Sequence, residues 1–482
     1  MTSLKRRLLS DSTVYGLGGV ANQTLAILLV PIYANVLGVA DYGAVAVINA
    51  TLSLATMFVT LALPQAFFRS YLQEAGGDAE RAAVLRTTLG LRLLVSAIGL
   101  VALMALAPLL TLFLFGGTDQ LLVVALIGPI VFCDTLNMVP LSFLRAERRP
   151  AAYSMLSFSR AVLGSILIIL FVVGFQLGIL GVLLGSVISA VVVAGSGMAF
   201  LARVGRLKLA LERPLVRQML VFSLPLVPAS IAGWTLNVSD RYLVQAFQGH
   251  SAVGVYAAGY TIGLAINALA VGPFTLAWGA AFWEVAKSEN AREAYARVMT
   301  GFVVFGSLIA LAISALATDG LRLLFRPEFE AGRFVVPFSA FAYVCYGIYS
   351  IGATGLNLVG RTRPILATTG IAAAINVLMN LILIPILGYM GAAVSTLASY
   401  ALLAVSTTWA SERHYPVPWD LPRIIGAMAV GMGLAAAALL GPDHIVWRIA
   451  CLGAYLPIMV TLGVIRSTDL AALRQLLRLR RR

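Results

Sequence analysis

The sequence predicts an all-α, polytopic membrane protein of about 14 transmembrane helices, arranged as two pseudo-symmetric six-helix lobes plus two C-terminal helices. Three observations support this fold class: the composition, the length of the apolar runs and an internal repeat. Hydrophobic residues make up 60% of the 482 residues and charged residues only 11%, whereas soluble domains carry about 25% charged residues. No polar stretch is long enough to fold as a separate soluble domain.

The apolar runs have the length of membrane-spanning helices. Each is about 20 residues or longer, and an α-helix of that length crosses a hydrocarbon core about 30 Å thick. The runs lack strict alternation, so helices rather than a β-barrel satisfy their backbone hydrogen bonds within lipid. The predicted spans are 13–36, 43–68, 88–115, 120–144, 151–175, 178–202, 218–246, 252–283, 297–321, 332–358, 364–387, 389–410, 422–440 and 444–465.

Basic residues gather on one side of the membrane if the loops alternate from a cytoplasmic N-terminus. The inner side of this topology holds most of the 34 Lys and Arg residues, among them Arg69, Arg92, Arg206, Lys208, Arg213 and Arg217. The outer side holds Arg322, Arg326 and Arg333, with Arg448 at a helix end. This asymmetry predicts that both termini are cytoplasmic, and it explains the net charge of +14 without a nucleic-acid partner.

An internal repeat with a period of about 210 residues divides the chain. Its matching positions are Gly38 to Gly43 with Gly249 to Gly254, Pro64 with Pro273, Gly178 with Gly388, and Arg149-Pro150 with Arg363-Pro364. The repeat predicts an N-lobe at 1–210, a C-lobe at 211–411, and two further helices with a basic amphipathic cytoplasmic tail at 412–482. Parallel repeats of this kind place a substrate site between the halves.

Several motifs in this order resemble a known family. They are Ser-Asp-Ser-Thr-Val-Tyr-Gly at 10–16, Asp41-Tyr42-Gly43, Leu63-Pro64 with Arg69, Ser223-Leu224-Pro225, and Asp240-Arg241-Tyr242. Together they resemble the Wzx-like polysaccharide and O-antigen flippases of the multidrug/oligosaccharidyl-lipid/polysaccharide exporter superfamily. The resemblance covers essentially the whole chain.

The resemblance implies a function and a location. It implies alternating access that moves an undecaprenyl-pyrophosphate-linked oligosaccharide from the cytoplasmic to the outer leaflet of the bacterial cytoplasmic (inner) membrane, for surface polysaccharide and lipopolysaccharide synthesis. It also implies a cationic central cavity and coupling to a proton or sodium gradient, with no bound cofactor. The expected partners are the lipid-linked oligosaccharide, membrane lipids and the polysaccharide assembly machinery.

Charged residues inside the predicted helices are the candidates for the site, because a charge in the bilayer centre usually faces a protein interior or a watery cavity. Arg69, Arg160 and Arg241 are candidate ligands for the pyrophosphate or glycan, since an arginine fork matches phosphate geometry. Asp134 and Asp240 are candidates for ion coupling or for ion pairs.

Each candidate also has a structural interpretation. Arg160 could pair with Asp134, and Arg69 could extend to the headgroups from a helix end. Asp240 and Arg241 point about 100° apart on one helix, so we expect them to make no ideal pair with each other. No catalytic residue and no metal-ligand set is expected.

Other functions remain open at this point. A lipid II flippase would share the pyrophosphate cargo, and a multidrug cation antiporter of the same superfamily would need an acidic cavity. A membrane polymerase or ligase is disfavoured, because the outer loops are short and carry no paired His, Asp or Glu. The sequence therefore favours a transporter over an enzyme, and it leaves open a non-transporting scaffold for assembly.

Overall fold

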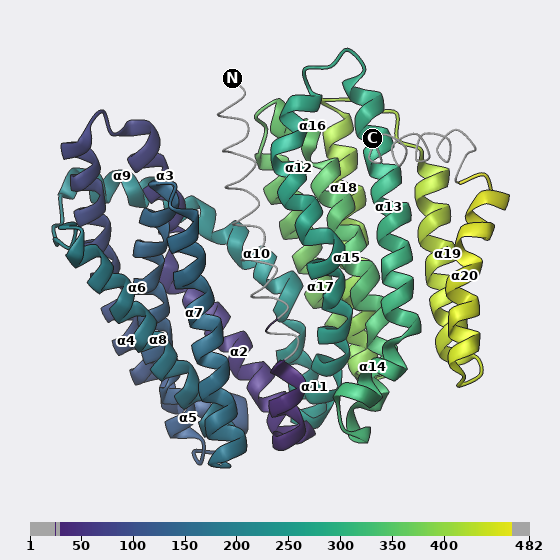
Figure 1. Ribbon diagram of the computed structural model, residues 1–482, viewed down its shortest axis with the longest axis horizontal. Coiled ribbons are helices and arrows are strands. Elements are labelled where there is room, and N and C mark those ends of the chain that lie inside the picture. Colours follow the sequence, from purple (N-terminus) through teal and green to yellow (C-terminus); the bar gives the residue numbers. More distant parts are fainter. Residues whose placement is uncertain (1–24, 26–28, 465–482) are drawn as a thin grey trace. The chain divides into compact units, whose positions relative to one another are not determined.

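A computed structural model describes residue 25 and residues 29–464, and every regular element in them is a helix (Figure 1). Within these described residues, eleven helical spans are long and apolar enough to cross a membrane, and α20 (Ile445–Thr461) is a shorter apolar helix. Together they overlap every predicted span except 13–36, which lies mainly outside the described residues. The all-α polytopic prediction is confirmed.

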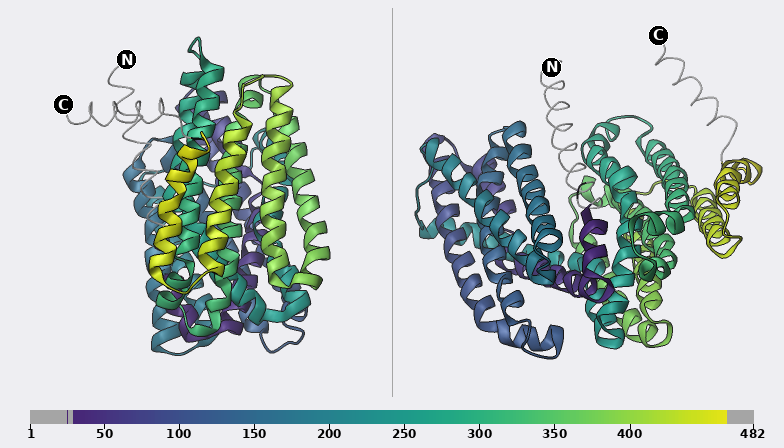
Figure 2. Two further views of the ribbon diagram at one scale, coloured as in Figure 1. Left: turned by 90° about the vertical axis from the view of Figure 1, so that its right-hand side faces the viewer. Right: turned by 60° about the horizontal axis from the view of Figure 1, so that its bottom comes forward.

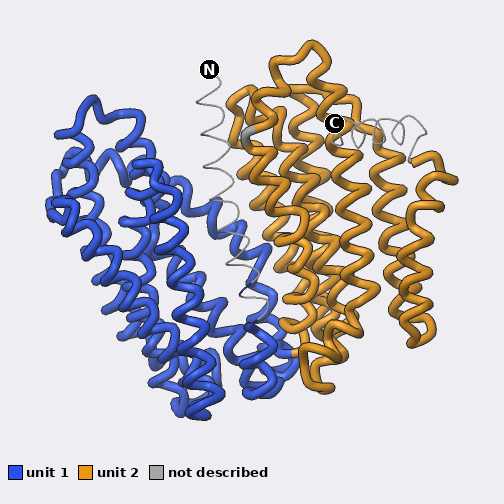
Figure 3. The backbone as a smooth tube through the Cα atoms, viewed as in Figure 1, with its two compact units in different colours: residues 1–254 blue, residues 255–482 orange. Residues whose placement is uncertain are grey.

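The chain divides into two compact units, residues Met1–Gly254 and Val255–Arg482 (Figure 3). The helices that begin in unit 1 are α2 (Val39–Thr60), α3 (Leu63–Arg69), η1 (Ser70–Glu74), α4 (Asp78–Phe115), α5 (Leu121–Ala125), α6 (Ile127–Ala146), α7 (Pro150–Ile169), η2 (Leu170–Gly174), α8 (Gly178–Arg203), α9 (Arg213–Ser223), η3 (Leu224–Leu226), α10 (Val227–Val238) and α11 (Asp240–Ile266). The helices of unit 2 are η4 (Asn267–Val271), α12 (Gly272–Val285), α13 (Ala291–Ala315), α14 (Ala317–Leu324), η5 (Pro327–Phe334), α15 (Val335–Gly352), α16 (Thr354–Leu358), α17 (Arg363–Leu387), α18 (Tyr389–Glu412), α19 (Leu421–Leu440) and α20.

The helix packing repeats from one unit to the other. In unit 1, α4 packs on α6, α6 packs on α8, and α7 packs on α8. In unit 2, α13 packs on α15, α15 on α18, and α17 on α18, which is the same order of pairs. Helices α19 and α20 form an additional pair against α13 (Figure 2). The internal repeat is thus visible in the packing, while the lobe boundaries at 1–210, 211–411 and 412–482 stay a prediction.

Two glycines mark the same turn in the two repeats. Gly38 precedes α2 with φ 80° and ψ 175°, and Gly249 interrupts α11 with φ 79° and ψ 179°. A side chain disfavours this positive φ, so glycine is the residue that allows the chain to reverse here without strain. The turn at Gly249 divides the stretch Arg213–Gly279 at the boundary between the predicted spans 218–246 and 252–283.

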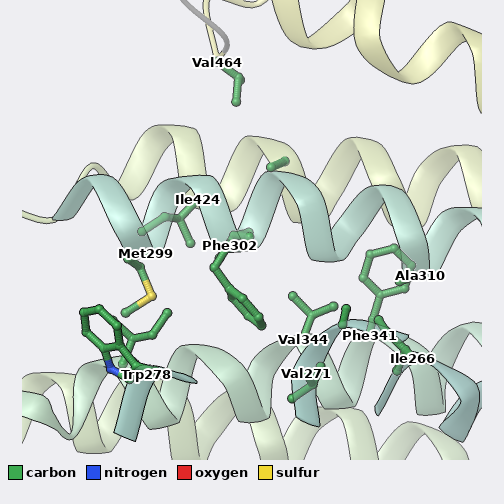
Figure 4. Packing of buried hydrophobic residues seen from close by; sticks show 14 of the residues in the cluster. Ile266, Val271, Trp278, Met299, Phe302, Ala310, Phe341, Val344, Ile424 and Val464 are labelled. Atoms are coloured by element: carbon green, nitrogen blue, oxygen red, sulfur yellow. The ribbon is translucent and has the colours of Figure 1, made fainter. Parts of the chain in front are cut away.

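The core of unit 2 contains a cluster of aromatic side chains between α12, α13 and α15 (Figure 4). The rings of Phe274 and Phe302 lie 4.4 Å apart between centroids, and Trp278 stacks on Phe274. The indole Nε1 of Trp278 donates to Thr354 Oγ1 at 3.1 Å, so its polar atom is satisfied. Trp278 is the repeat counterpart of Arg69, which shows that one position became a core residue in unit 2 and a charged residue in unit 1.

Candidate functional site

The second predicted helix breaks where α2 meets α3. Leu61 and Ala62 both adopt left-handed conformations, with φ of 48° and 52°, which is unusual for residues with a side chain. Pro64 follows in the first turn of α3 and has no N–H to donate to the Thr60 carbonyl. The break therefore leaves backbone carbonyls at the end of α2 in need of donors.

Arg92 of α4 supplies these donors. Its Nη1 lies 3.2 Å from the carbonyl oxygens of both Val59 and Thr60, and the residue is only 1% exposed. Arg92 lies within the predicted span 88–115, and the structure places it in α4, which starts at Asp78. Its placement on the inner side of the membrane stays a prediction. The Arg92 side chain holds the helix break.

A cavity of about 600 Å³ lies beside this break, entirely within unit 1. Helices α2, α3, α6, α7, α8 and α10 line it. Its polar lining residues are Asn49, Ser53, Thr56, Thr60, Gln65, Asp134, Arg160, Ser186 and Ser230. Most of these are small hydroxyl and amide groups that can donate and accept hydrogen bonds, as recognition of a sugar requires.

The charged pair in this cavity is Arg160 and Asp134. Arg160 Nε lies 2.9 Å from Asp134 Oδ1 and Nη2 lies 3.1 Å from Oδ2, which is the bidentate geometry of a strong arginine–carboxylate pair. Arg160 Nη1 donates to Ser189 Oγ at 2.6 Å. Three of the five guanidinium N–H groups thus have partners within the described residues, and two remain for a ligand. The side chains of Arg160 and Asp134 are 25% and 32% exposed, respectively, so a ligand in the cavity can contact both.

The charge of this cavity differs from the expectation that the resemblance raised. Asp134 and Arg160 are the charged groups among its lining residues, so the wall as described is formally neutral rather than cationic. Arg160 nonetheless lines the cavity, and two of its guanidinium N–H groups have no partner within the described residues. An anionic ligand could reach it by competing with Asp134 for the guanidinium.

Glycine at position 164 allows the guanidinium to fold along its own helix. A Cβ built on Gly164 would lie 3.2 Å from Arg160 Nη1 and 3.2 Å from Ser189 Oγ. Gly164 and Ser189 were not among the predicted site residues, since neither residue carries a charge that marks it. The spacing of four residues between Arg160 and Gly164, one helical turn, is the signal that could have found the glycine.

The other candidate residues lie outside the lining of this cavity. Arg241 Nη1 lies 3.1 Å from Asp240 Oδ1 and 3.0 Å from the Asn237 carbonyl oxygen. The two consecutive residues thus contact each other through one pair of atoms, because the Arg241 side chain folds back toward Asp240. Arg69 Nε lies 3.0 Å from Glu74 Oε1, and its guanidinium lies 4.7 Å from the centroid of the Phe222 ring. The roles proposed for these residues stay predictions.

Side-chain hydrogen bonds tie the cavity wall together. Trp234 Nε1 of α10 donates to Ser53 Oγ of α2 at 2.8 Å, and the Thr51 and Tyr242 hydroxyls lie 2.8 Å apart. These bonds link α2 to the helices that follow α9, so a displacement of α10 would change the shape of the cavity.

The fold resembles that of known transporters. The chain superposes on the lipid II flippase MurJ in an inward closed conformation with a TM-score of 0.74 at 13% identity, covering 95% of this chain and 100% of that one. It superposes on an inward-facing multidrug resistance MATE family transporter of the MOP superfamily with a TM-score of 0.62 at 17% identity, covering 84% and 96%. At these identities the likeness defines the class of fold.

The family follows from the sequence itself. Residues 8–279 match the model of the polysaccharide biosynthesis protein family, which is more than half of the chain, so the chain belongs to this family. An uncharacterized membrane protein of Methanocaldococcus jannaschii, MJ1068, is 23% identical over 205 residues. That alignment covers 42% of this chain and 40% of the relative, so the chain matches less than half of the relative's length.

Proposed function

We propose that this protein is a flippase that moves an undecaprenyl-pyrophosphate-linked oligosaccharide from the cytoplasmic to the outer leaflet of a bacterial inner membrane. One observation carries the proposal: Arg160 presents unused donors to a cavity lined by hydroxyl and amide groups. Membership of the polysaccharide biosynthesis family and the transporter fold support it. The lipid tail would stay in the bilayer while the headgroup enters the protein.

The paired carboxylate suggests how the cargo is bound and released. A pyrophosphate oxygen and the Asp134 carboxylate would compete for the same Arg160 fork. Bound cargo and the Arg160–Asp134 pair would therefore exclude each other, and re-formation of the pair would expel the anion. Coupling of this exchange to a proton or sodium gradient is part of the proposal.

The experiment that tests this proposal separates cargo binding from a purely structural ion pair. Arg160→Ala, Asp134→Ala and the double variant are expressed in a flippase-null strain, and surface polysaccharide is measured at equal protein abundance. If the pair is only structural, removal of both charges should recover the activity that each single change loses, because no buried charge is left unpaired. If Arg160 binds the cargo, the double variant should be as inactive as Arg160→Ala.

A matched control uses Arg69→Ala, which removes an arginine of the same unit that does not line the cavity. We expect Arg69→Ala to retain more export than Arg160→Ala. Wild-type levels of surface polysaccharide in the Arg160→Ala strain would refute the site. If every variant, including Arg69→Ala, lost export at unchanged protein abundance, the loss would not be specific to the Arg160 site.

Lipid II is the alternative cargo favoured by the fold of MurJ. The two cargoes share the pyrophosphate chemistry, so Arg160 would serve either one. Complementation of a strain depleted of its lipid II flippase distinguishes them, because only a lipid II flippase would restore growth there. A multidrug cation antiporter is disfavoured by the cavity of unit 1, whose single lining carboxylate is already paired with Arg160.

A further inference from the structure

A second cavity in unit 1, of about 800 Å³, lies between α4 and α9 and is separate from the site of Arg160. Leu91 and Leu94 of α4 form one wall, and Leu211 with α9 and η3 forms the other. Among its lining residues, only Arg213 and Arg217 are charged, and both lie at the start of α9. The cavity is thus an apolar groove that is basic at one end.

The groove follows one face of α9. Its lining positions Arg213, Val216, Arg217, Leu220, Val221 and Leu224 recur at intervals of three and four residues, as one face of an α-helix does. The two arginines fall on the first turns and the apolar residues on the rest. From position 213 to 224 the helix rises about 16 Å, so the charged end and the far apolar end are well separated.

The opposite face of α9 is already occupied. Met219 is 1% exposed and belongs to a core cluster with Phe67, Leu85 and Leu89, against which Leu215 and Phe222 also pack. On the groove side, by contrast, Val221 is 67% exposed. The groove face is therefore free of protein within the described residues, and it is apolar enough to need another partner.

A backbone hydrogen bond and an ion pair hold the segment that precedes α9 against α4. The Ala210 N–H donates to the Arg86 carbonyl at 3.2 Å, and Gly90 permits this approach, because a Cβ there would lie 2.2 Å from the Ala210 oxygen. Arg86 also pairs with Glu212 through Nε at 2.9 Å. The carboxylate next to Arg213 is therefore neutralised by another arginine.

Arg213 and Arg217 have no ion pair or hydrogen bond from their side chains within the described part of the chain. They lie at the end of the helices that the charge pattern places on the cytoplasmic side, where anionic headgroups attract basic residues. We propose that this groove binds an anionic phospholipid, whose phosphate contacts Arg213 and Arg217 and whose acyl chain lies along Val221 and Leu224.

The position of the groove gives the lipid a consequence for the candidate site. Leu224 and Pro225 line the groove, whereas Val227 and Ser230 of the same continuous stretch line the cavity that contains Arg160. The short η3 turn therefore contributes to the groove and leads directly into α10, and Pro225 and Pro228 at this junction have no backbone N–H to donate. A lipid in the groove would contact this turn, whose continuation lines the cavity.

The test uses the purified full-length protein and native mass spectrometry. Phosphatidylglycerol and phosphatidylcholine with identical acyl chains are offered at equal concentration, and bound lipid is counted. We expect wild type to retain phosphatidylglycerol preferentially. Arg213→Gln combined with Arg217→Gln should lower that retention by on the order of tenfold, the equivalent of one charge-assisted hydrogen bond.

Two matched variants distinguish a specific lipid site from non-specific attraction of an anionic lipid to basic residues. Arg206→Gln combined with Lys208→Gln removes two exposed charges of the loop before α9, outside the groove, and should leave retention unchanged. Val221→Trp fills the groove without changing the charge and should reduce retention. Glycerol phosphate, which is a headgroup without chains, should not displace the lipid.

The proposal is overturned by any of three results. Equal retention of both lipids by wild type would show that charge has no role in binding. An equal loss in the Arg206→Gln/Lys208→Gln variant would indicate non-specific attraction to the loop. Unchanged retention by Val221→Trp would place the acyl chain elsewhere. Melting temperatures of all variants in detergent establish that each one is folded, and the lipid measurement does not depend on flippase activity.

Discussion

Gly43 and Gly254 pack their turns against each other in a reciprocal contact. A Cβ built on Gly43 would lie 1.8 Å from the His250 carbonyl oxygen, and one on Gly254 would lie 2.1 Å from the Val39 carbonyl oxygen. Val39 and His250 are repeat counterparts, as are Gly43 and Gly254, because both pairs have the same separation in sequence. The two contacts are therefore reciprocal, since each glycine approaches the carbonyl oxygen of the residue that precedes its counterpart by four positions.

Substitution of either glycine should weaken this contact. In Gly43→Ala and in Gly254→Ala the new methyl group meets backbone, which has no flexible side chain that could move aside. We expect each change to lower the free energy of unfolding by about 1–3 kcal/mol, as overpacking does. Thermal unfolding in detergent measures it. The control Gly195→Ala on α8 places its methyl in open space and should not lower the melting temperature, because alanine is favoured over glycine in a helix. Equal melting of Gly43→Ala and Gly195→Ala would contradict the reciprocal contact.

Arg92 should stabilise the break between α2 and α3. Arg92→Met removes the donors of the Val59 and Thr60 carbonyls, and Pro64 gives Thr60 no replacement. An unsatisfied buried acceptor costs about 1–3 kcal/mol, so the melting temperature should fall.

Two further variants test whether the lost carbonyl contacts cause the fall in melting temperature of Arg92→Met. Arg92→Lys retains donors and should lie between wild type and Arg92→Met. Arg86→Met removes an arginine from a surface pair with Glu212, and a surface pair contributes only about 0–1 kcal/mol. If Arg86→Met destabilised the protein as much as Arg92→Met, the two carbonyl contacts would not be the cause.

The sequence was a good guide to the helices and to the turns, because both depend on local patterns. Apolar length predicted the spans, and Gly38 and Gly249 marked equivalent reversals through their position in the repeat. The helix break was not predictable, since leucine and alanine at 61 and 62 favour a right-handed helix and only Pro64 signals a bend.

Charged residues were predicted less well, because their positions depend on tertiary packing. Arg92 lies within the predicted span 88–115, but its contacts with the Val59 and Thr60 carbonyls depend on a helix break that the sequence does not reveal. Arg160 was recognised because its depth in an apolar run left few alternatives, and Asp134 was the nearest acid at similar depth. The pairing of Arg241 with Asp240 depends on how the arginine chain folds back, which helix geometry alone does not determine.

Gly164 should act as a positioning residue for Arg160. Gly164→Ala places a methyl at 3.2 Å from Arg160 Nη1 and should reduce export modestly. Gly164→Val adds bulk that pushes the guanidinium away from Ser189, so export should fall severalfold at equal protein abundance. In the Arg160→Ala background, Gly164→Val should have no further effect, because the two changes then affect one interaction. Additive losses would show that Gly164 acts through helix packing instead.

The loop between α19 and α20 carries an ion network that faces α14 and η5. Arg322 Nη1 lies 2.8 Å from Asp443 Oδ2 and its Nη2 lies 2.6 Å from Glu330 Oε1. Arg448 contacts Asp443 as well and lies 2.5 Å from Asp319 Oδ2. The network joins the additional helix pair to the rest of unit 2.

Asp443 should make the stability of this network depend on pH. The hydrogen bond from Arg322, together with the charges of Arg322, Arg448 and Arg333, lowers the pKa of Asp443 below its usual 3.8. A carboxyl with a lowered pKa in the folded state stabilises the protein fully above the unfolded value, and this contribution is lost as pH falls through the folded value. Wild type should therefore lose melting temperature as the pH falls below 3.8.

Asp443→Asn isolates this carboxyl from the other acids of the protein. The variant should melt below wild type at pH 7 and show a shallower loss on acidification, because its residue 443 no longer titrates. Asp119→Asn removes an exposed carboxylate after α4 and should keep the wild-type slope. Melting curves of the three proteins from pH 7 to pH 3 provide the measurement. If Asp443→Asn and wild type lost stability in parallel, the acid sensitivity would not arise from Asp443.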